Sequence, residues 1–179
     1  MACPFFLPVE KLENGAWPHP ARLPLGWGWS GCCTAPGHEG EVPSAHELHE
    51  CNLGYALGCG RLPKQRAWDA VRFFVMGSRD AAKDERGDAT DGCGLGSERS
   101  SVQFRYVCER DHLPVEHGSV EFEMKSKQWV RSHADARVQR MAECCLESYL
   151  AKCGRSETRR VASGSGLLRE SSRRGRETA

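Results

Sequence analysis

The sequence predicts an α+β protein, in which a proline-rich, cysteine-bearing N-terminal module sits on a small antiparallel three-stranded sheet covered by a C-terminal helix. Three observations lead to this prediction. Residues 1–43 hold seven prolines, three later segments alternate apolar and polar residues, and a helical apolar stripe runs through 133–152. We divide the chain into a cysteine-bearing metal module (1–64), a sheet-helix unit (65–153) that forms one domain with it, and a disordered basic tail (154–179).

The N-terminal module is expected to contain one helix and little other regular structure. Prolines lack a backbone donor and glycines loosen the chain, so long elements are not expected in the first part of the module. A helix is expected over 44–57, because Ser44 and Glu47 have the spacing of a capping box. Its apolar face includes Cys51, and Gly58 would end it.

The predicted sheet has three strands, over 70–76, 102–109 and 119–124, each rich in β-branched or aromatic residues. The segment 78–101 is rich in Asp, Arg, Gly and Ser, so we expect a flexible excursion there. The segment 110–118 contains a proline and a glycine, which favours a loop between antiparallel neighbours.

Residues 133–152 have the strongest helical pattern, and their apolar stripe can cover one face of the sheet. We expect Gly154 to end this helix. The side chains of Cys108 and Cys145 are expected in the core and that of Cys144 at its periphery. The stripe comprises Val138, Met141, Ala142, Cys145 and Tyr149.

Charge and hydropathy exclude several classes of partner. The formal net charge is +1, and the basic tail has no interleaved aromatic residue, so we expect no nucleic-acid partner. No apolar run approaches the roughly 20 residues that cross a bilayer, and the start of the chain has no basic leader. We therefore expect a cytoplasmic protein with no membrane partner, whose thiols stay reduced. Cys93, in the polar excursion, is the thiol expected to be most reactive.

Four cysteines of the first sixty residues carry the functional hypothesis, and we refer to them as the four-cysteine set: Cys3, Cys33, Cys51 and Cys59. Four thiolates are the usual complement of an iron–sulfur cluster or a structural zinc ion. We expect the set to converge on one site. Eight residues span about 12 Å along a helix, so the chain after Cys51 must turn back to bring Cys59 close.

Zinc sites usually take their ligands as close pairs, whereas widely separated single cysteines suit a cluster. The preferred cofactor is therefore an iron–sulfur cluster of the 4Fe-4S type, and zinc is the alternative. His46 and His49, one helical turn apart, are candidate ligands of a mixed zinc site, although neighbouring glutamates favour exposed polar residues. A metal-free interaction protein with structural cysteines is also possible, since cysteine is among the most buried residue types.

An enzyme that depends on cysteine and histidine is the second alternative. His112 and His117 bracket the expected 110–118 loop, with Asp111 and Glu116 beside them, an arrangement that suits acid–base work. A polar hairpin explains the same residues without any catalytic role.

The local sequences around the four-cysteine set resemble a group of uncharacterised bacterial proteins. The group shares an N-terminal cysteine–proline, a Cys-Asn-Leu-Gly-Tyr-Ala segment and a following cysteine near a proline. The likeness spans most of residues 3–152 and implies that the four cysteines form a unit, but it supplies no activity. The segments that carry it are Cys3–Pro8, Leu25–Gly26, Gly31–Cys33, Cys51–Ala56, Cys59 with Pro63, Asp69–Phe73, Glu109–Val115 and His117–Gly118.

This chain departs from the group pattern at two positions. It has Cys32 beside Cys33, which leaves open which of the two is the ligand, and by position we favour Cys33. It also has Leu62 where an aromatic residue is expected. The sequence thus predicts a metal-binding protein, with a structural or electron-transfer role toward an unknown redox or protein partner.

Overall fold

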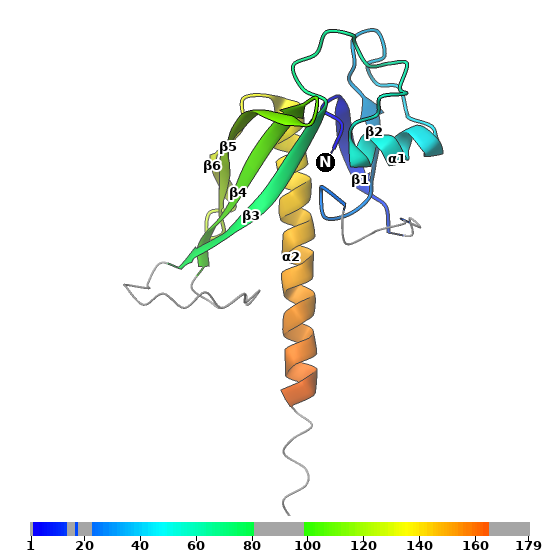
Figure 1. Ribbon diagram of the computed structural model, residues 1–179. Helices are drawn as coiled ribbons and strands as arrows, with labels where there is room; N and C mark the ends of the chain where they lie inside the picture. Colours follow the sequence, from blue (N-terminus) through cyan, green and yellow to red (C-terminus); the bar gives the residue numbers. More distant parts are fainter. Residues whose placement is uncertain (1, 14–16, 18–22, 81–98, 165–179) are drawn as a thin grey trace, which may run out of the picture.

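The computed structural model describes residues 2–13, 17, 23–80 and 99–164. In these residues the chain forms two antiparallel sheets and two helices. The N-terminal half of the long helix α2 (Ala136–Gly164) lies between a four-stranded sheet on one side and a two-stranded sheet with helix α1 on the other, and the rest of the helix extends beyond both (Figure 1). Both sheets therefore pack against this one helix.

The larger sheet has four strands, so the prediction of a three-stranded sheet is wrong, although the α+β class is consistent with the architecture. The missed strand, β6, has only four residues, too few for an alternating pattern to be read. It is held by a cross-strand pair, because the rings of Phe122 and Trp129 lie edge to face with centroids 5.3 Å apart. The strands, in spatial order, are β3 (Ala70–Asp80), β4 (Arg99–Arg110), β5 (Leu113–Glu123) and β6 (Gln128–Arg131).

A tight turn at Asp111 and His112 joins β4 to β5. Both residues have positive φ angles, 50° and 64°, as a type I′ hairpin turn requires. The expected loop over 110–118 is therefore mostly strand. Pro114 is tolerated in β5 because it pairs with Glu109 next to a register shift.

The smaller sheet pairs β1 (Phe6–Lys11) with β2 (Trp29–Cys33), two short strands that the prolines and glycines of this segment hid from sequence analysis. The two backbones approach closely at Gly31, where a Cβ atom would lie 2.1 Å from the carbonyl oxygen of Leu7. Only glycine fits there, so the residue that weakens the strand pattern is also the residue that permits the pairing.

Helix α1 (Ala45–Leu53) begins with the predicted capping box. The Glu47 carboxylate accepts from the Ser44 N–H at 2.7 Å, and the Ser44 hydroxyl accepts from the Glu47 N–H at 3.4 Å. The helix ends before Gly54, which has a φ of 70°, so it is shorter than the expected 44–57.

Helix α2 begins after Asp135, whose carboxylate accepts from the Arg137 N–H at 2.8 Å. It does not end at Gly154 as expected. A glycine inside a helix costs only about 1 kcal/mol relative to alanine, and the residues that follow include good helix formers, so the helix continues. Cys93 and the polar excursion over 81–98 lie outside the described residues, as does the end of the tail.

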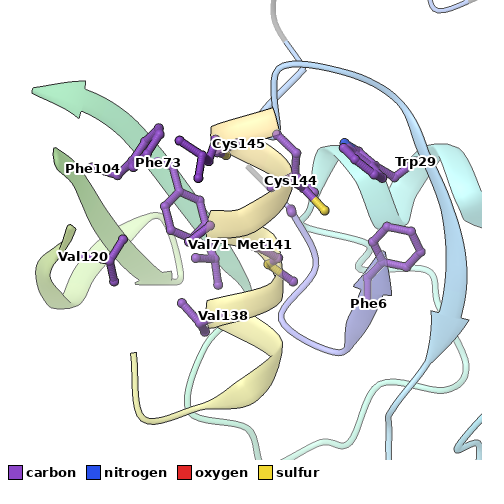
Figure 2. Close-up of a cluster of buried hydrophobic side chains, with 14 of the residues drawn as sticks. Phe6, Trp29, Val71, Phe73, Phe104, Val120, Val138, Met141, Cys144 and Cys145 are labelled. Atoms are coloured by element: carbon purple, nitrogen blue, oxygen red, sulfur yellow. The ribbon is translucent and has the colours of Figure 1, made fainter. Parts of the chain in front are cut away.

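The core is built on two faces of α2. Figure 2 shows the side chains of Val71 and Phe104 on one side of the helix and those of Phe6 and Trp29 on the other. This two-sided packing explains why the prediction for Cys144 is wrong. Cys144 is fully buried because it faces the smaller sheet, whereas the predicted burial of Cys145 and Cys108 is confirmed.

Two arginines of α2 attach the helix to the N-terminal strand. The Arg140 guanidinium donates to the carbonyl oxygens of Pro8 and Val9, at 2.9 and 3.1 Å. The Arg137 guanidinium lies over the ring of Phe5, 5.2 Å from its centroid. Of the helices in the described ranges, neither is long and apolar enough to cross a membrane.

One buried amide links α1 to β2. The Asn52 side chain is 1% exposed, accepts from the Trp29 N–H at 3.0 Å and donates to the Trp29 carbonyl at 2.9 Å. It also donates to the Leu48 carbonyl at 2.9 Å. The amide thereby substitutes for a neighbouring strand, because it pairs both backbone groups of a residue at the edge of β2.

We predict that the substitution Asn52→Ala lowers the free energy of unfolding by about 2–4 kcal/mol, because two buried backbone groups of Trp29 lose their partners at about 1–3 kcal/mol each. Urea unfolding measures the change. The adjacent Leu53, which is exposed, provides the control, and Leu53→Ala is expected to cost less than about 1 kcal/mol. Equal losses in the two variants would contradict this role of Asn52.

Candidate metal centre

The first cysteine of the set is fixed by backbone hydrogen bonds on both sides. Ala2 exchanges two bonds with Val71 of β3, at 2.7 and 2.8 Å, and the Cys3 N–H donates to the Cys51 carbonyl at 2.8 Å. Pro4 then follows in a tight turn, closed by a bond from the Phe6 N–H to the Cys3 carbonyl at 3.1 Å. Cys3 therefore lies beside the last turn of α1, which contains Cys51.

The second cysteine lies at the end of β2. Cys33 pairs with Phe6 across the small sheet, and its sulfur accepts from the Ala35 N–H at 3.4 Å. Adjacent strand residues point to opposite faces, so Cys32 and Cys33 cannot share one site. The thiol that lies near Cys3 and Cys51 is that of Cys33.

The chain reverses direction after α1 and so brings Cys59 back. The reversal lies at Gly54 and Tyr55, which have φ angles of 70° and 53°. A Cβ atom at Gly58 or Gly60 would meet nothing within 4 Å, so neither glycine is required by the packing. Cys59 itself is half-buried.

The four thiols lie close enough to influence one another electrostatically. Burial, with smaller contributions from the other three thiols of the set, raises the pKa of Cys51 to about 12. Burial also raises the pKa of Cys3 to about 11, against the lowering effect of nearby backbone N–H groups, with added contributions from Cys33 and Cys59. Four segments far apart in the sequence thus converge.

Backbone N–H groups point at two of the sulfurs. Those of Phe5 and Phe6 lower the pKa of Cys3, and that of Ala35 donates to the Cys33 sulfur. Such bonds stabilise a thiolate and tune the potential of thiolate-bound iron. The donor set therefore fits a thiolate-ligated centre in its chemistry.

The spacing of the thiols does not fit a single bound ion. Within residues 2–13, 17, 23–80 and 99–164, no group of three or more His, Cys, Asp or Glu side chains is arranged to hold a metal ion. Ligand sulfurs around one zinc ion sit at about 2.3 Å from the metal, so they must be nearly in contact with one another. The four-cysteine set is gathered but is not drawn together to that extent.

Packing in the core explains some of the cysteines but not all of them. Cys108, Cys144 and Cys145 belong to the hydrophobic core cluster, and burial raises the pKa of each. Within the four-cysteine set, Cys33 and Cys59 lie outside that cluster, although their thiols lie near those of Cys3 and Cys51. A role as a small apolar residue suits Cys33, which is buried, better than Cys59, which is only half-buried.

A cation beside the set was missed by sequence analysis. Hydrogen bonds to Asp135 raise the pKa of Arg137, and the nearby Cys3 adds to the effect. Arg137 is thus a permanent positive charge near the thiols. No sequence pattern could reveal this, because more than a hundred residues separate it from Cys3.

The candidate histidines lie apart from the set. His46 is exposed, and His49 stacks on Trp17 with ring centroids 5.7 Å apart, so neither is gathered with the thiols into a group that could hold zinc. His112 is exposed in the hairpin turn, stacked on Tyr55 at 4.1 Å, and His117 is exposed in β5. An exposed hairpin counts against an enzyme built on His112 and His117.

Comparison with known proteins identifies no relative of this chain, so the case for the site depends on its geometry. No family model matches the chain, and no match was found among curated proteins or solved structures.

We predict that the metal-free protein loses stability as pH rises above about 9. The folded-state pKa values of Cys3 and Cys51, about 11 and about 12, exceed the ordinary value of 9.0, so the unfolded chain releases these protons first. Their contribution is complete below pH 9 and disappears as pH rises to about 12. Urea midpoints measured across this range test it.

The variant Cys51→Ala provides the comparison for this prediction. It removes one titrating thiol, so its free energy of unfolding is expected to fall less steeply above pH 9 than that of the natural chain. The same slope in both proteins would show that the Cys51 thiol ionises equally in the folded and unfolded states.

Proposed function

We propose that this chain is a metal-binding protein that holds an iron–sulfur cluster through the thiolates of the four-cysteine set. The observation that carries the proposal is the convergence of four thiols from four separate segments, with two of the sulfurs already facing backbone N–H groups. The likeness to the bacterial group rests on the same cysteines and remains a prediction.

A cluster accounts for the spacing of the thiols better than zinc does. A four-iron cluster takes one thiolate at each of four iron atoms, so its ligand sulfurs stand farther apart than those around a single ion. Thiols that influence one another without forming a single-ion site match that requirement. Zinc remains the alternative occupant and is distinguished by the test below.

The proposed role is structural or in electron transfer. As a structural element, the cluster would join the segment before β1, strand β2, helix α1 and the loop after α1, each of which contributes one cysteine. Cys59, the more exposed member of the set, would be the edge nearest to a redox or protein partner. Eight cysteines of the described part are free thiols, which suits the reducing cytoplasm that we propose, whereas Cys153 is disulfide-bonded, which such a compartment disfavours.

We predict that protein purified without oxygen contains iron and acid-labile sulfide, shows thiolate-to-iron charge-transfer absorption, and bleaches on reduction. The variant Cys33→Ser is expected to lose most of the metal. Cys32→Ser is the matched control, because it changes the adjacent residue on the opposite face of β2, and it should keep the metal.

Three outcomes separate the hypotheses. Iron and sulfide lost only in Cys33→Ser support the cluster. One zinc ion per chain, also lost only in Cys33→Ser, would replace the cluster by a zinc site at the same residues. Neither metal in the natural chain, or equal metal in both variants, would overturn the proposal and leave structural cysteines in an interaction protein.

A further inference from the structure

A cavity of about 240 Å³ lies on the side of α2 that faces the larger sheet. Its apolar walls come from three elements. Phe73 of β3 and Phe104 of β4 are buried, and Leu23 closes one side from the loop before β2. Figure 2 shows both phenylalanines beside Cys145 of α2. The cavity is thus separate from the four-cysteine set, and Val75 at its mouth is 45% exposed.

Four residues of α2 line this cavity at helical spacing, namely Cys145, Ser148, Tyr149 and Lys152. Two of them are already engaged within the protein. The Cys145 thiol donates to the Pro24 carbonyl at 3.6 Å, and the Tyr149 ring lies edge to face with Phe104, with centroids 6.3 Å apart. The polar groups that remain for a ligand are those of Ser148 and Lys152.

The Ser148 hydroxyl is buried without a partner among the described residues. The side chain is 2% exposed, and no hydrogen bond satisfies its oxygen. An unpaired buried hydroxyl costs about 1–3 kcal/mol, so native proteins rarely retain one. Ser148 lines the cavity, so a ligand there is the candidate partner for its hydroxyl.

The Lys152 ammonium is the cation of this site. It lies one helical turn beyond Ser148 on the same face, and its side chain is exposed at the surface end of the cavity. Both polar groups approach Gly26. A Cβ atom built there would lie 3.3 Å from the Ser148 oxygen and 3.5 Å from the Lys152 nitrogen. A Cβ atom there would also lie 2.7 Å from the Ser148 Cβ, so only glycine, here with a φ of 73°, lets this loop pack so closely against Ser148.

We propose that this cavity binds a small amphipathic carboxylate, with its apolar body between Phe73, Phe104 and Leu23 and its carboxylate on Ser148 and Lys152. Both of those groups donate to a carboxylate, which can accept from each. A cationic or purely apolar ligand would leave the Ser148 hydroxyl or the Lys152 charge unused. The volume lies below the roughly 300–1,000 Å³ typical of drug-sized ligands, which favours a short chain or a single ring.

The test uses octanoate as the probe and the full chain at neutral pH, followed by amide NMR shifts. Octanoate is expected to give saturable shifts at Gly26, Ser148 and Lys152. Octan-1-ol has the same chain without the charge, octylammonium has the opposite charge, and both should bind at least about tenfold more weakly. Lys152→Glu should weaken octanoate about tenfold or more, whereas Lys125→Glu, an exposed lysine outside the site, should not.

Ser148→Ala separates a ligand-binding hydroxyl from a structural one. Because the hydroxyl has no partner in the described structure, its removal should not lower the free energy of unfolding of the ligand-free protein, yet octanoate affinity should fall about two- to tenfold. A destabilised variant with unchanged octanoate affinity would assign the hydroxyl a structural role and overturn the proposal. Saturable shifts with none of the three probes, or equal binding of octanoate and octan-1-ol that is insensitive to Lys152→Glu, would overturn it too.

Discussion

The backbone hydrogen bonds of Ala2 and Cys3 are the constraint on which the rest of the structure depends. Ala2 joins the start of the chain to β3, and Cys3 joins it to the end of α1, so two consecutive residues connect the larger sheet to the N-terminal module. Strand β1 follows within three residues and can pair with β2 only because its start is held there. The position of the Cys3 thiol results from the same bonds.

Helix α2 packs against both of the parts that this connection joins. Its N-terminal half lies between the larger sheet and the smaller sheet (Figure 1), and side chains on this half belong to the hydrophobic core. Arg140 bonds the carbonyl oxygens of β1 where Pro8 and the adjacent register shift interrupt regular pairing, so the weakest part of that strand is supported by the helix. The same helix supplies Arg137 near the thiols and Ser148 at the cavity.

Local patterns in the sequence predicted local structure well and long-range pairing poorly. The capping box at Ser44 depends only on neighbouring residues, and so does the alternation that places Cys108 on the inward face of its strand. Both predictions are confirmed. Strands β1, β2 and β6 are short and interrupted, and they exist because partners distant in sequence pair with them. The continuation of α2 past Gly154 shows the same limit, since one glycine is a weak stop where the surrounding residues favour a helix.

The chemistry of the four-cysteine set follows from a conflict between burial and charge. Burial raises the pKa of Cys3 to about 11 and that of Cys51 to about 12, so without a bound metal these thiols remain protonated at neutral pH. Gathering thiolates in one place without a metal would be costly, and one arginine cannot offset several of them. Under the proposed function, a multiply charged inorganic centre would displace these protons and bind thiols that already lie near one another, with N–H groups facing two of the sulfurs.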